Sequence, residues 1–117
     1  MIFDSDLHSY DQFLGGRLTV AQPKTGYRAG VDPVLLAASV PAGRGESVLE
    51  LGCGVGVASL CLGWRVPGLA LSGVEIMGDY AQVARENATR NAIEFDVRQG
   101  DVSARPTPFY DQSFHHV

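Results

Sequence analysis

The amino-acid sequence predicts an α/β domain built on a parallel sheet. Short apolar stretches at residues 47–51, 69–75 and 95–99 are typical of strands, and patterns with a helical period separate them. Strands that alternate with helices of this length form a parallel sheet, because each helix returns the chain to the edge where the previous strand began. Right-handed crossovers place successive strands outward from the first, and a fourth strand at residues 114–117 would return to its other side.

Composition and charge narrow the class of protein. Of the 117 residues, 45% are hydrophobic, which is enough for a packed core, and the net charge of −4 argues against a broad nucleic-acid surface. Cys53 and Cys61 lie in apolar stretches without metal-binding spacing, so we expect reduced thiols. The N-terminus does not resemble a signal peptide, and no apolar run is long enough to cross a membrane. We therefore expect a cytoplasmic protein with no metal and no membrane partner.

The chain ahead of the sheet contains signals for a hairpin and a helix. Residues 17–22 alternate as a short strand and residues 23–26 have turn chemistry before Tyr27, so a small β-hairpin is expected around that turn. Asp32 and Pro33 then predict a helix start, with the aspartate as the capping residue and the proline at the first helical position.

Two amphipathic helices are expected between the strands. The first has its apolar face at Val57, Leu60, Cys61 and Trp64. The second has its apolar face at Tyr80, Val83, Ala84 and Ala88. Asp79 in the first turn and Arg90 in the last turn of the second helix match the preference of the helix dipole.

A glycine-rich turn between the first strand and its helix is the most informative feature. Gly52, Gly54 and Gly56 stand at alternate positions there. Glycine suits places where φ is positive or where a ligand must approach the backbone, and the helix start behind the turn offers free N–H groups. The turn therefore predicts a ligand site, although a tight strand-to-helix turn alone would also explain the glycines.

The same turn helps to distinguish between classes of ligand. A nicotinamide or flavin site needs G-x-G-x-x-G/A, whose third small residue would stand where this chain has Val57. Glu50 precedes the first glycine by two residues, and a carboxylate there would repel a pyrophosphate but attract an ammonium or sulfonium group. A cationic ligand that carries an amino acid is therefore favoured over a dinucleotide.

The run V-L-E-L-G-C-G-V-G at residues 48–56 resembles motif I of the class I methyltransferases, a Rossmann-like family that uses S-adenosyl-L-methionine. The resemblance implies that the acid and the loop hold the methionine part of this cofactor. The residues concerned are Glu50, Gly52, Cys53, Gly54 and Gly56.

Two further acids match the family by position. Glu75 ends the second strand, where the family's ribose-binding acid stands, and a carboxylate can accept both ribose hydroxyls. Asp101 follows the third strand in the adenine-contacting position, and Ile76 and Val102 complete this part of the implied site. A solvated loop acid at Glu75 and a turn former at Asp101 remain alternatives. We expect Glu75 at a strand end rather than in the core, so that its replacement leaves the fold intact.

The stretches F-L-G-G-R-L and Q-P-K-T-G-Y-R-A-G-V-D-P resemble the bacterial tRNA adenine-N6 methyltransferases that act on valine tRNA. The resemblance implies tRNA as the substrate, and it places Arg28, Gly30 and Asp32 near the carboxylate and amino ends of the cofactor. A simple capping role for Asp32 remains an alternative. Residues 32–117 are then a partial S-adenosylmethionine-binding, Rossmann-like domain, and residues 1–31 are a hairpin and cap segment.

Family members carry N-P-P-Y or a close variant after the fourth strand, where it orients the target amine and stacks on the base. This motif is absent from the 117 residues, and residues 114–117 resemble the strand that leads into it. We therefore expect the cofactor-binding half of the enzyme, with no catalytic residue and no activity of its own. Methylation of protein glutamine or of a small molecule, and a non-catalytic nucleoside-binding module, remain alternatives.

The end of the chain also contains a histidine pair, His115 and His116. Adjacent strand residues point to opposite faces of a sheet, so the pair is not expected to bind a metal. The outer edge of this fourth strand offers backbone groups with which a second copy of the chain can pair, and the sequence leaves the oligomeric state open.

Overall fold

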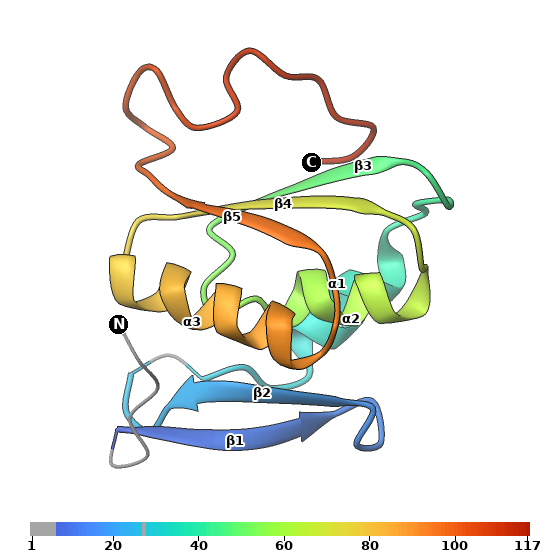
Figure 1. The fold of residues 1–117 in the computed structure, drawn as a ribbon, viewed down its shortest axis with the longest axis vertical. Coiled ribbons are helices and arrows are strands. Elements are labelled where there is room, and N and C mark those ends of the chain that lie inside the picture. Colours follow the sequence, from blue (N-terminus) through green and yellow to red (C-terminus); the bar gives the residue numbers. More distant parts are fainter. Residues whose placement is uncertain (1–6, 27) are drawn as a thin grey trace.

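The computed structural model describes residues 7–26 and 28–117 (Figure 1). After an N-terminal hairpin, helices and strands alternate along the chain. The elements are β1 (His8–Phe13), β2 (Leu18–Pro23), α1 (Asp32–Ser39), β3 (Ser47–Leu51), α2 (Val57–Arg65), β4 (Ala70–Glu75), α3 (Gly78–Arg90) and β5 (Phe95–Gln99). The predicted α/β class with a parallel sheet is confirmed.

The parallel sheet has the order β3-β4-β5. The carboxyl ends of its strands meet at one edge, where Leu51 pairs with Val74 and Glu75 pairs with Gln99. On the other side of β3, Val48 forms a parallel bridge with His116. The strand order therefore reverses at β3, and in open α/β sheets the crevice at such a reversal is where ligands bind.

The expected fourth strand at residues 114–117 is reduced to this single bridge. Its placement beside β3 is as predicted, and the His115 N–H donates to the Ser47 carbonyl at 3.0 Å. Phe114 does not extend the pairing. Its ring packs edge-on against Phe109, with the two centroids 6.0 Å apart.

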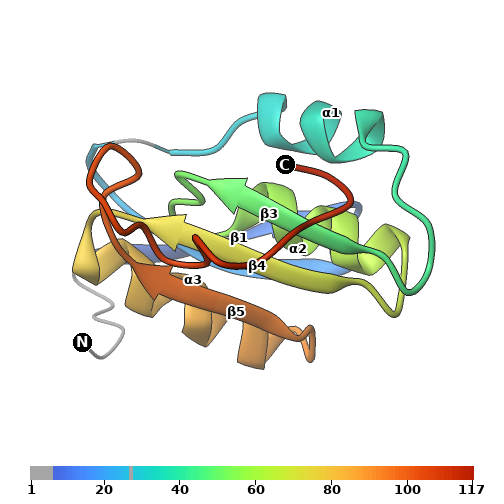
Figure 2. The ribbon, with the colours of Figure 1, turned by 90° about the horizontal axis from the view of Figure 1, so that it is seen from above.

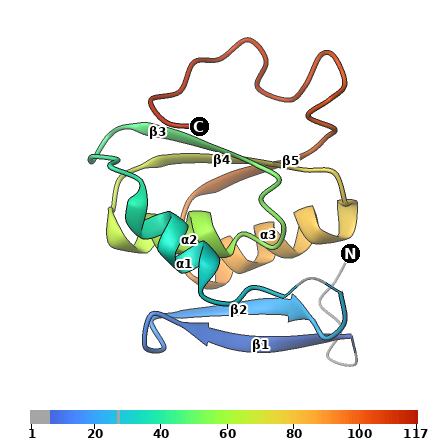
Figure 3. The same cartoon turned by 180° about the vertical axis from the view of Figure 1, so that it is seen from behind.

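The elements are layered about the sheet. The three helices and the hairpin lie on one side, and residues 100–117 run across the other (Figures 1 and 3). Seen from above, α1 lies beside β3, at the end of the sheet away from β5 (Figure 2). Leu18 of β2, Leu60 of α2 and Val83 of α3 are fully buried, and β2 shares one apolar core with the helices and the sheet.

Helices α2 and α3 bury the faces that the sequence predicts. Leu60 and Cys61 of α2 and Val83 and Ala84 of α3 are at most 2% exposed. Trp64 is the exception, because it is 45% exposed at the end of α2. The Arg17 guanidinium lies 5.1 Å from its ring centroid, so an arginine covers the ring that was expected to enter the core.

Helix α1 begins at Asp32, but the predicted aspartate cap is wrong. Val31 occupies the N-cap position, and no side chain caps the helix. Asp32 is already the first helical residue, one place too late for its carboxylate to reach back to the free N–H groups. Pro33 follows in the first turn, where its missing N–H costs nothing.

The hairpin forms around a different turn from the one predicted. β2 pairs antiparallel with β1, which precedes it, and the turn between them contains Leu14, Gly15 and Gly16. Their φ angles are 54°, 66° and 86°, which is left-handed backbone. Two of the three residues are glycines, which adopt this conformation without steric strain. The expected pairing across residues 23–26 is therefore wrong: of the two residues expected after that turn, Arg28 is not in a strand and Tyr27 lies outside the described residues.

Two asparagines dock the hairpin, Asn87 within α3 and Asn91 at the C-cap of that helix. The Asn87 amide accepts from the Ala21 N–H at 2.8 Å and donates to the Ala21 carbonyl at 3.1 Å. One turn later, the Asn91 amide accepts from the Thr19 N–H at 3.0 Å and donates to the Thr19 carbonyl at 2.9 Å. Side-chain amides thus complete the outer edge of β2 as a neighbouring strand would.

Candidate functional site

The turn after β3 has the open backbone that a ligand site requires. Gly52 and Gly54 have φ angles of 75° and 57°, and a Cβ atom at either would meet nothing within 4 Å. The Gly52 and Cys53 N–H groups both donate to the Val74 carbonyl, at 2.8 and 3.0 Å, which fixes the turn to β4. Gly56 has a different role, because a Cβ there would lie 3.2 Å from the Phe95 ring.

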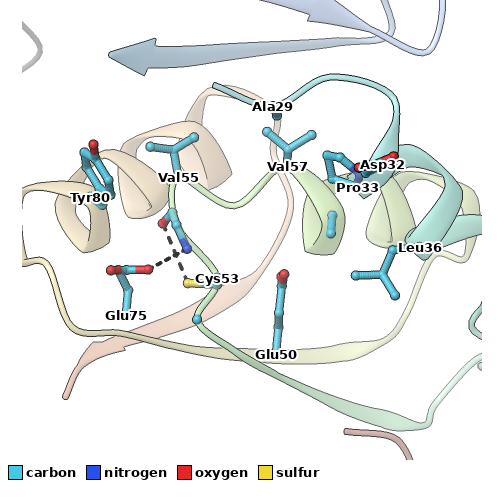
Figure 4. Close-up of a pocket in the computed structure, with 13 residues that line it drawn as sticks. Ala29, Asp32, Pro33, Leu36, Glu50, Cys53, Val55, Val57, Glu75 and Tyr80 are labelled. Carbon is cyan, nitrogen blue, oxygen red and sulfur yellow. Dashed lines mark hydrogen bonds between the residues drawn. The ribbon is translucent and has the colours of Figure 1, made fainter. Parts of the chain in front are cut away.

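A cavity of about 520 Å³ lies between this turn, α1 and the end of β4 (Figure 4). That volume is typical of a site for a nucleoside-sized ligand. Its lining residues are Ala29, Asp32, Pro33, Leu36, Glu50, Gly52, Cys53, Gly54, Val55, Val57, Ala58, Glu75 and Tyr80.

Glu50 enters the cavity from β3. Its side chain points toward α1 and the start of α2 (Figure 4), and its Oε1 accepts the Ser59 hydroxyl at 2.6 Å. Burial raises the pKa of the Glu50 carboxyl, and the nearby Glu75 carboxylate raises it further, while the Ser59 bonds lower it. A cation in the cavity would therefore stabilise the ionised form of this group.

Glu75 stands at the end of β4, as predicted, but it is buried, with only 7% of its surface exposed. Its Oε1 accepts the Gly54 N–H at 2.8 Å and its Oε2 accepts the Met77 N–H at 2.9 Å. The expectation that Glu75 lies outside the core is wrong, and so is the alternative of a solvated loop acid. The carboxylate ties the glycine turn to the start of α3, and each oxygen keeps a second lone pair for a ligand hydroxyl.

Three acidic residues from three elements line the cavity, namely Asp32 of α1, Glu50 of β3 and Glu75 of β4. None of the lining residues, all of them in the described part of the chain, is a lysine, arginine or histidine. A cleft with this excess of negative charge attracts cations and repels polyphosphates.

Two of the three predicted N-terminal site residues lie away from this cavity. The Arg28 guanidinium pairs with Asp11 at 2.8 Å and donates to the Pro23 carbonyl at 2.6 Å, so it is held on the hairpin. Gly30 does not line the cavity, and a Cβ there would meet nothing within 4 Å. Of the three N-terminal residues predicted, the structure brings only Asp32 to the cavity wall.

The predicted adenine-contacting residues lie at the same edge of the sheet but outside the cavity. The Gly100 N–H donates to the Glu75 carbonyl at 3.0 Å, which sets the end of β5 beside the end of β4. Asp101 is exposed, and its Oδ1 accepts the Ser103 hydroxyl at 2.6 Å and the Ser103 N–H at 2.9 Å. These two bonds lower the pKa of the Asp101 carboxyl.

Ile76 and Val102 follow the two strand ends and are 58% and 45% exposed. Large apolar side chains left this open beside a cavity are available to cover an apolar ring. Six residues of the predicted set thus line the cavity, and Ile76, Asp101 and Val102 lie outside it at the ends of β4 and β5.

Several lining residues were not predicted as site residues. Tyr80 was expected only as part of the apolar face of α3, yet it is half-buried at the cavity wall. Leu36 and Pro33 of α1 reach the cavity because the helix lies beside β3. No local signal identifies them, since their role depends on how α1 packs.

Both cysteines are free and buried, in agreement with the expected reduced thiols. Burial raises the pKa of Cys53 to about 12, with the negative charges of Glu50 and Glu75 adding to the effect. Burial raises the pKa of Cys61 to about 11. Neither thiol is a nucleophile at neutral pH, so Cys53 contributes backbone and bulk to the cavity.

The histidines near the end of the chain are engaged with the start of β3. His115 Nδ1 lies 3.0 Å from the Ser47 nitrogen, and His116 Nε2 lies 3.0 Å from Glu46 Oε1. Within residues 7–26 and 28–117, no three His, Cys, Asp or Glu side chains gather as a metal site would require.

None of the helices in the described residues is both long and apolar enough to cross a bilayer.

Comparison with known proteins connects this geometry to a family. Residues 48–117 match the family model described as a methyltransferase domain. The chain is 37% identical over 86 residues to the tRNA1(Val) (adenine(37)-N6)-methyltransferase of Yersinia enterocolitica. The aligned region covers 71% of this chain and 34% of that protein. It is 37% identical over 73 residues to the protein of the same name from Proteus mirabilis, covering 62% of this chain and 29% of that protein. The chain thus spans about a third of the length of these relatives.

Solved structures support the fold. The tRNA (uracil-54, C5)-methyltransferase of Pyrococcus abyssi, determined with S-adenosyl-L-homocysteine, superposes with a TM-score of 0.62 at 17% identity, covering 81% of this chain and 24% of that one. A SAM-dependent methyltransferase from Agrobacterium tumefaciens superposes with a TM-score of 0.62 at 22% identity, covering 81% of this chain and 33% of that one. The predicted Rossmann-like fold and the predicted resemblance to tRNA adenine-N6 methyltransferases are confirmed.

Proposed function

The chain belongs to the family of methyltransferase domains, and from that premise we propose that it binds S-adenosyl-L-methionine and serves methyl transfer to the N6 amine of an adenine in tRNA. The cavity beside the glycine turn is the proposed cofactor site. A tRNA-modifying role is also the basis on which we propose a cytoplasmic location.

The carboxylates of the cavity carry this proposal. S-adenosylmethionine has two positive groups, the sulfonium and the amino-acid ammonium, and a single carboxylate. A wall with Asp32, Glu50 and Glu75 and with no basic side chain among its described lining residues suits such a ligand. The open space over Gly52 and Gly54 lets the ligand approach the backbone closely.

We propose a distinct contact for each part of the cofactor. Glu75 would accept the ribose hydroxyls with its remaining lone pairs, and Glu50 would face the ammonium group. The exposed side chains of Ile76 and Val102 would cover the adenine, with Asp101 beside it. The methyl group would then lie within the cavity with the glycine turn behind it. Methyl transfer requires chiefly this fixed orientation of the donor.

Part of the predicted contact set is not supported by the observed contacts. Gly56 packs against Phe95, and Arg28 is held by Asp11, so we do not propose either as a direct contact. Gly30 lies outside the cavity wall. Asp32 remains in the set, because the structure removes its capping role and places it on the wall.

The proposed acceptor rests on the relatives rather than on the cavity. Two relatives at 37% identity are named tRNA1(Val) (adenine(37)-N6)-methyltransferase. The motif N-P-P-Y does not occur in the 117 residues. We propose that these residues hold the methyl donor and that other residues of the protein orient the acceptor amine.

The test uses the protein as its gene encodes it, with radiolabelled S-adenosylmethionine and bulk tRNA. Label in N6-methyladenosine after nuclease digestion is the expected result. Residues 1–117 alone should bind the cofactor without transferring label. Label in protein glutamine or in a small molecule would show that the encoded protein methylates that acceptor instead of tRNA. Cofactor binding with no transfer of label would show a non-catalytic nucleoside-binding module.

A further inference from the structure

The Glu50 carboxylate has one neighbour in the structure that the family resemblance does not assign. Ser59 is the third residue of α2 and only 4% exposed, and its hydroxyl donates to Glu50 Oε1 at 2.6 Å. The Ser59 N–H adds a backbone hydrogen bond to the same carboxyl, and both bonds lower its pKa. Ser59 thus holds the Glu50 carboxyl from inside the protein, while Glu50 also lines the cavity.

The hydroxyl has an alternative acceptor that it does not use. A serine inside a helix commonly bonds to the carbonyl four residues earlier, which for Ser59 is that of Val55. The Val55 carbonyl instead accepts the Asn87 amide at 2.9 Å. The Ser59 hydroxyl is directed out of its own helix to the carboxylate, at the helix end where backbone N–H groups also favour negative charge.

No cationic side chain among the described residues lines the cavity beside Glu50, so the hydrogen bond from Ser59 matters for its charged form. Asp32 from α1, Glu75 from β4 and Cys53 from the glycine turn share its cavity, and none of them is a cation. Behind β3, His115 and His116 line a second cavity of about 730 Å³ that Glu50 also borders, but they are engaged with β3 and Glu46. Burial and Glu75 raise the pKa of Glu50, and Ser59 is the group that lowers it.

We propose that Ser59 is a positioning residue for the cofactor site, whose hydroxyl fixes the Glu50 carboxylate and stabilises its charged form for contact with the ammonium group of the bound methionine moiety. This inference rests on the proposed function. It assigns Ser59 a role exerted through Glu50, without contact to the cofactor itself.

The experiment measures the dissociation constant of S-adenosylhomocysteine by calorimetry from pH 5 to pH 9. This probe retains the ammonium group and lacks the sulfonium, so it isolates the contact in question. The proteins are the unsubstituted chain, Ser59→Ala, Glu50→Gln and the double variant. Ser39→Ala is the matched control, because its hydroxyl bonds only to the Leu36 carbonyl at the end of α1.

A hydrogen bond to a charged group is worth about one to two pKa units. Ser59→Ala should therefore move the pH at which binding strengthens upward by about one unit, and weaken binding roughly tenfold below that midpoint. At the alkaline end, where Glu50 is ionised in every protein, the difference should shrink. In the Glu50→Gln background the same serine substitution should have no pH-dependent effect.

Thermal unfolding without ligand gives a second readout. Ser59→Ala should lower the melting temperature more at pH 8 than at pH 4, because only the charged carboxylate loses a strong bond. If Ser59→Ala weakens binding equally at every pH, or leaves the pH profile of binding unshifted, Ser59 has only a packing role. That result would overturn this inference and leave the proposed function standing. No binding of the probe by the unsubstituted chain would overturn the proposed function as well.

Discussion

Individual residues of the proposed cofactor cavity have contacts that stabilise the fold as well as a proposed role in binding. Glu75 is the clearest example, because its two oxygens hold the Gly54 and Met77 N–H groups while facing the cavity. Glu50 is held by Ser59 in a buried place that raises its pKa. The two acids therefore have opposite consequences for stability when they are replaced by the uncharged amide.

We expect Glu75→Gln to weaken both stability and binding. Both Glu75 oxygens accept a backbone N–H, from Gly54 and Met77. In the glutamine variant, the amide NH₂ replaces one of these oxygens and cannot accept. One backbone N–H is then left without an acceptor, at a cost of about 1–3 kcal/mol in unfolding free energy. Losing a charged acceptor for the ribose should weaken S-adenosylhomocysteine binding by roughly tenfold or more. Thermal unfolding and calorimetry measure the two effects. Asp79→Asn, an exposed acid in the first turn of α3, is the control, and an unchanged dissociation constant would remove Glu75 from the site.

We expect Glu50→Gln to weaken binding but to stabilise the free protein at neutral pH. A carboxyl whose pKa is raised by folding binds its proton more tightly in the folded state, so stability falls as pH rises from its ordinary value of 4.5 through the raised value. The amide avoids that loss and can still accept the Ser59 hydroxyl. The melting temperature should therefore rise at pH 7 and change little at pH 4.

Glu46 provides a control of opposite sign for that measurement. Bonds from Gly43 and His116 lower the pKa of the Glu46 carboxyl. Its stabilising effect is present above its ordinary pKa and is lost as pH falls through the lowered value, so Glu46→Gln should lower the melting temperature at pH 7. The same direction of change in both variants at pH 7 would contradict the assigned role of burial at Glu50.

At the scale of elements, the sequence was sufficient wherever local pattern decides the structure. The strand, turn and helix around Gly52 have their periodicity and their positive-φ residues within one continuous segment, and they form as predicted. β1 was missed because H-S-Y-D-Q-F is polar and has no strand signal of its own. It becomes a strand because the left-handed turn at Leu14 folds it onto β2.

Long-range contacts explain the other differences. Asn87 and Asn91 bond to residues 66 and 72 positions away, and nothing in their local sequence indicates that they act as a surrogate strand. The cavity wall formed by α1 depends in the same way on where the helix packs. The acids at strand ends could be predicted because parallel topology alone brings those ends together.

The docking of the hairpin leads to a prediction for Asn87→Leu. The leucine has similar size but leaves the Ala21 N–H and the Ala21 and Val55 carbonyls without a partner in a fully buried place. At about 1–3 kcal/mol for a buried unsatisfied group, we expect a loss of roughly 3 kcal/mol or more in unfolding free energy. Hydrogen exchange should show the Ala21 amide losing protection first.

The matched control is Thr89→Ala, which changes an exposed residue of the same helix whose hydroxyl bonds only to the Arg85 carbonyl. It should leave hairpin protection intact. Because Val55 also lines the cofactor cavity, Asn87→Leu should weaken cofactor binding as well. Retained protection of the Ala21 amide in Asn87→Leu would show that apolar packing alone holds the hairpin in place.

For the whole molecule, we propose that the negative charge around the cavity selects the ligand. The chain carries a net charge of −4, and the cavity concentrates three carboxylates with no cation among its described lining residues. S-adenosylmethionine therefore approaches a field that attracts it, whereas the pyrophosphate of NAD approaches one that repels it. We expect S-adenosylmethionine to bind more tightly than NAD at every salt concentration.

The salt dependence of the two ligands distinguishes this electrostatic cause from a difference in shape. Salt screens attraction and repulsion alike, with a Debye length that falls from about 10 Å at 0.1 M to about 3 Å at 1 M. Raising sodium chloride across this range should weaken S-adenosylmethionine binding and strengthen any residual NAD binding, so that the two calorimetric series have opposite slopes. S-adenosylhomocysteine, which lacks the sulfonium charge, should respond less than S-adenosylmethionine. Parallel slopes for S-adenosylmethionine and NAD would mean that the shape of the glycine turn, and not the carboxylates around it, decides which ligand enters.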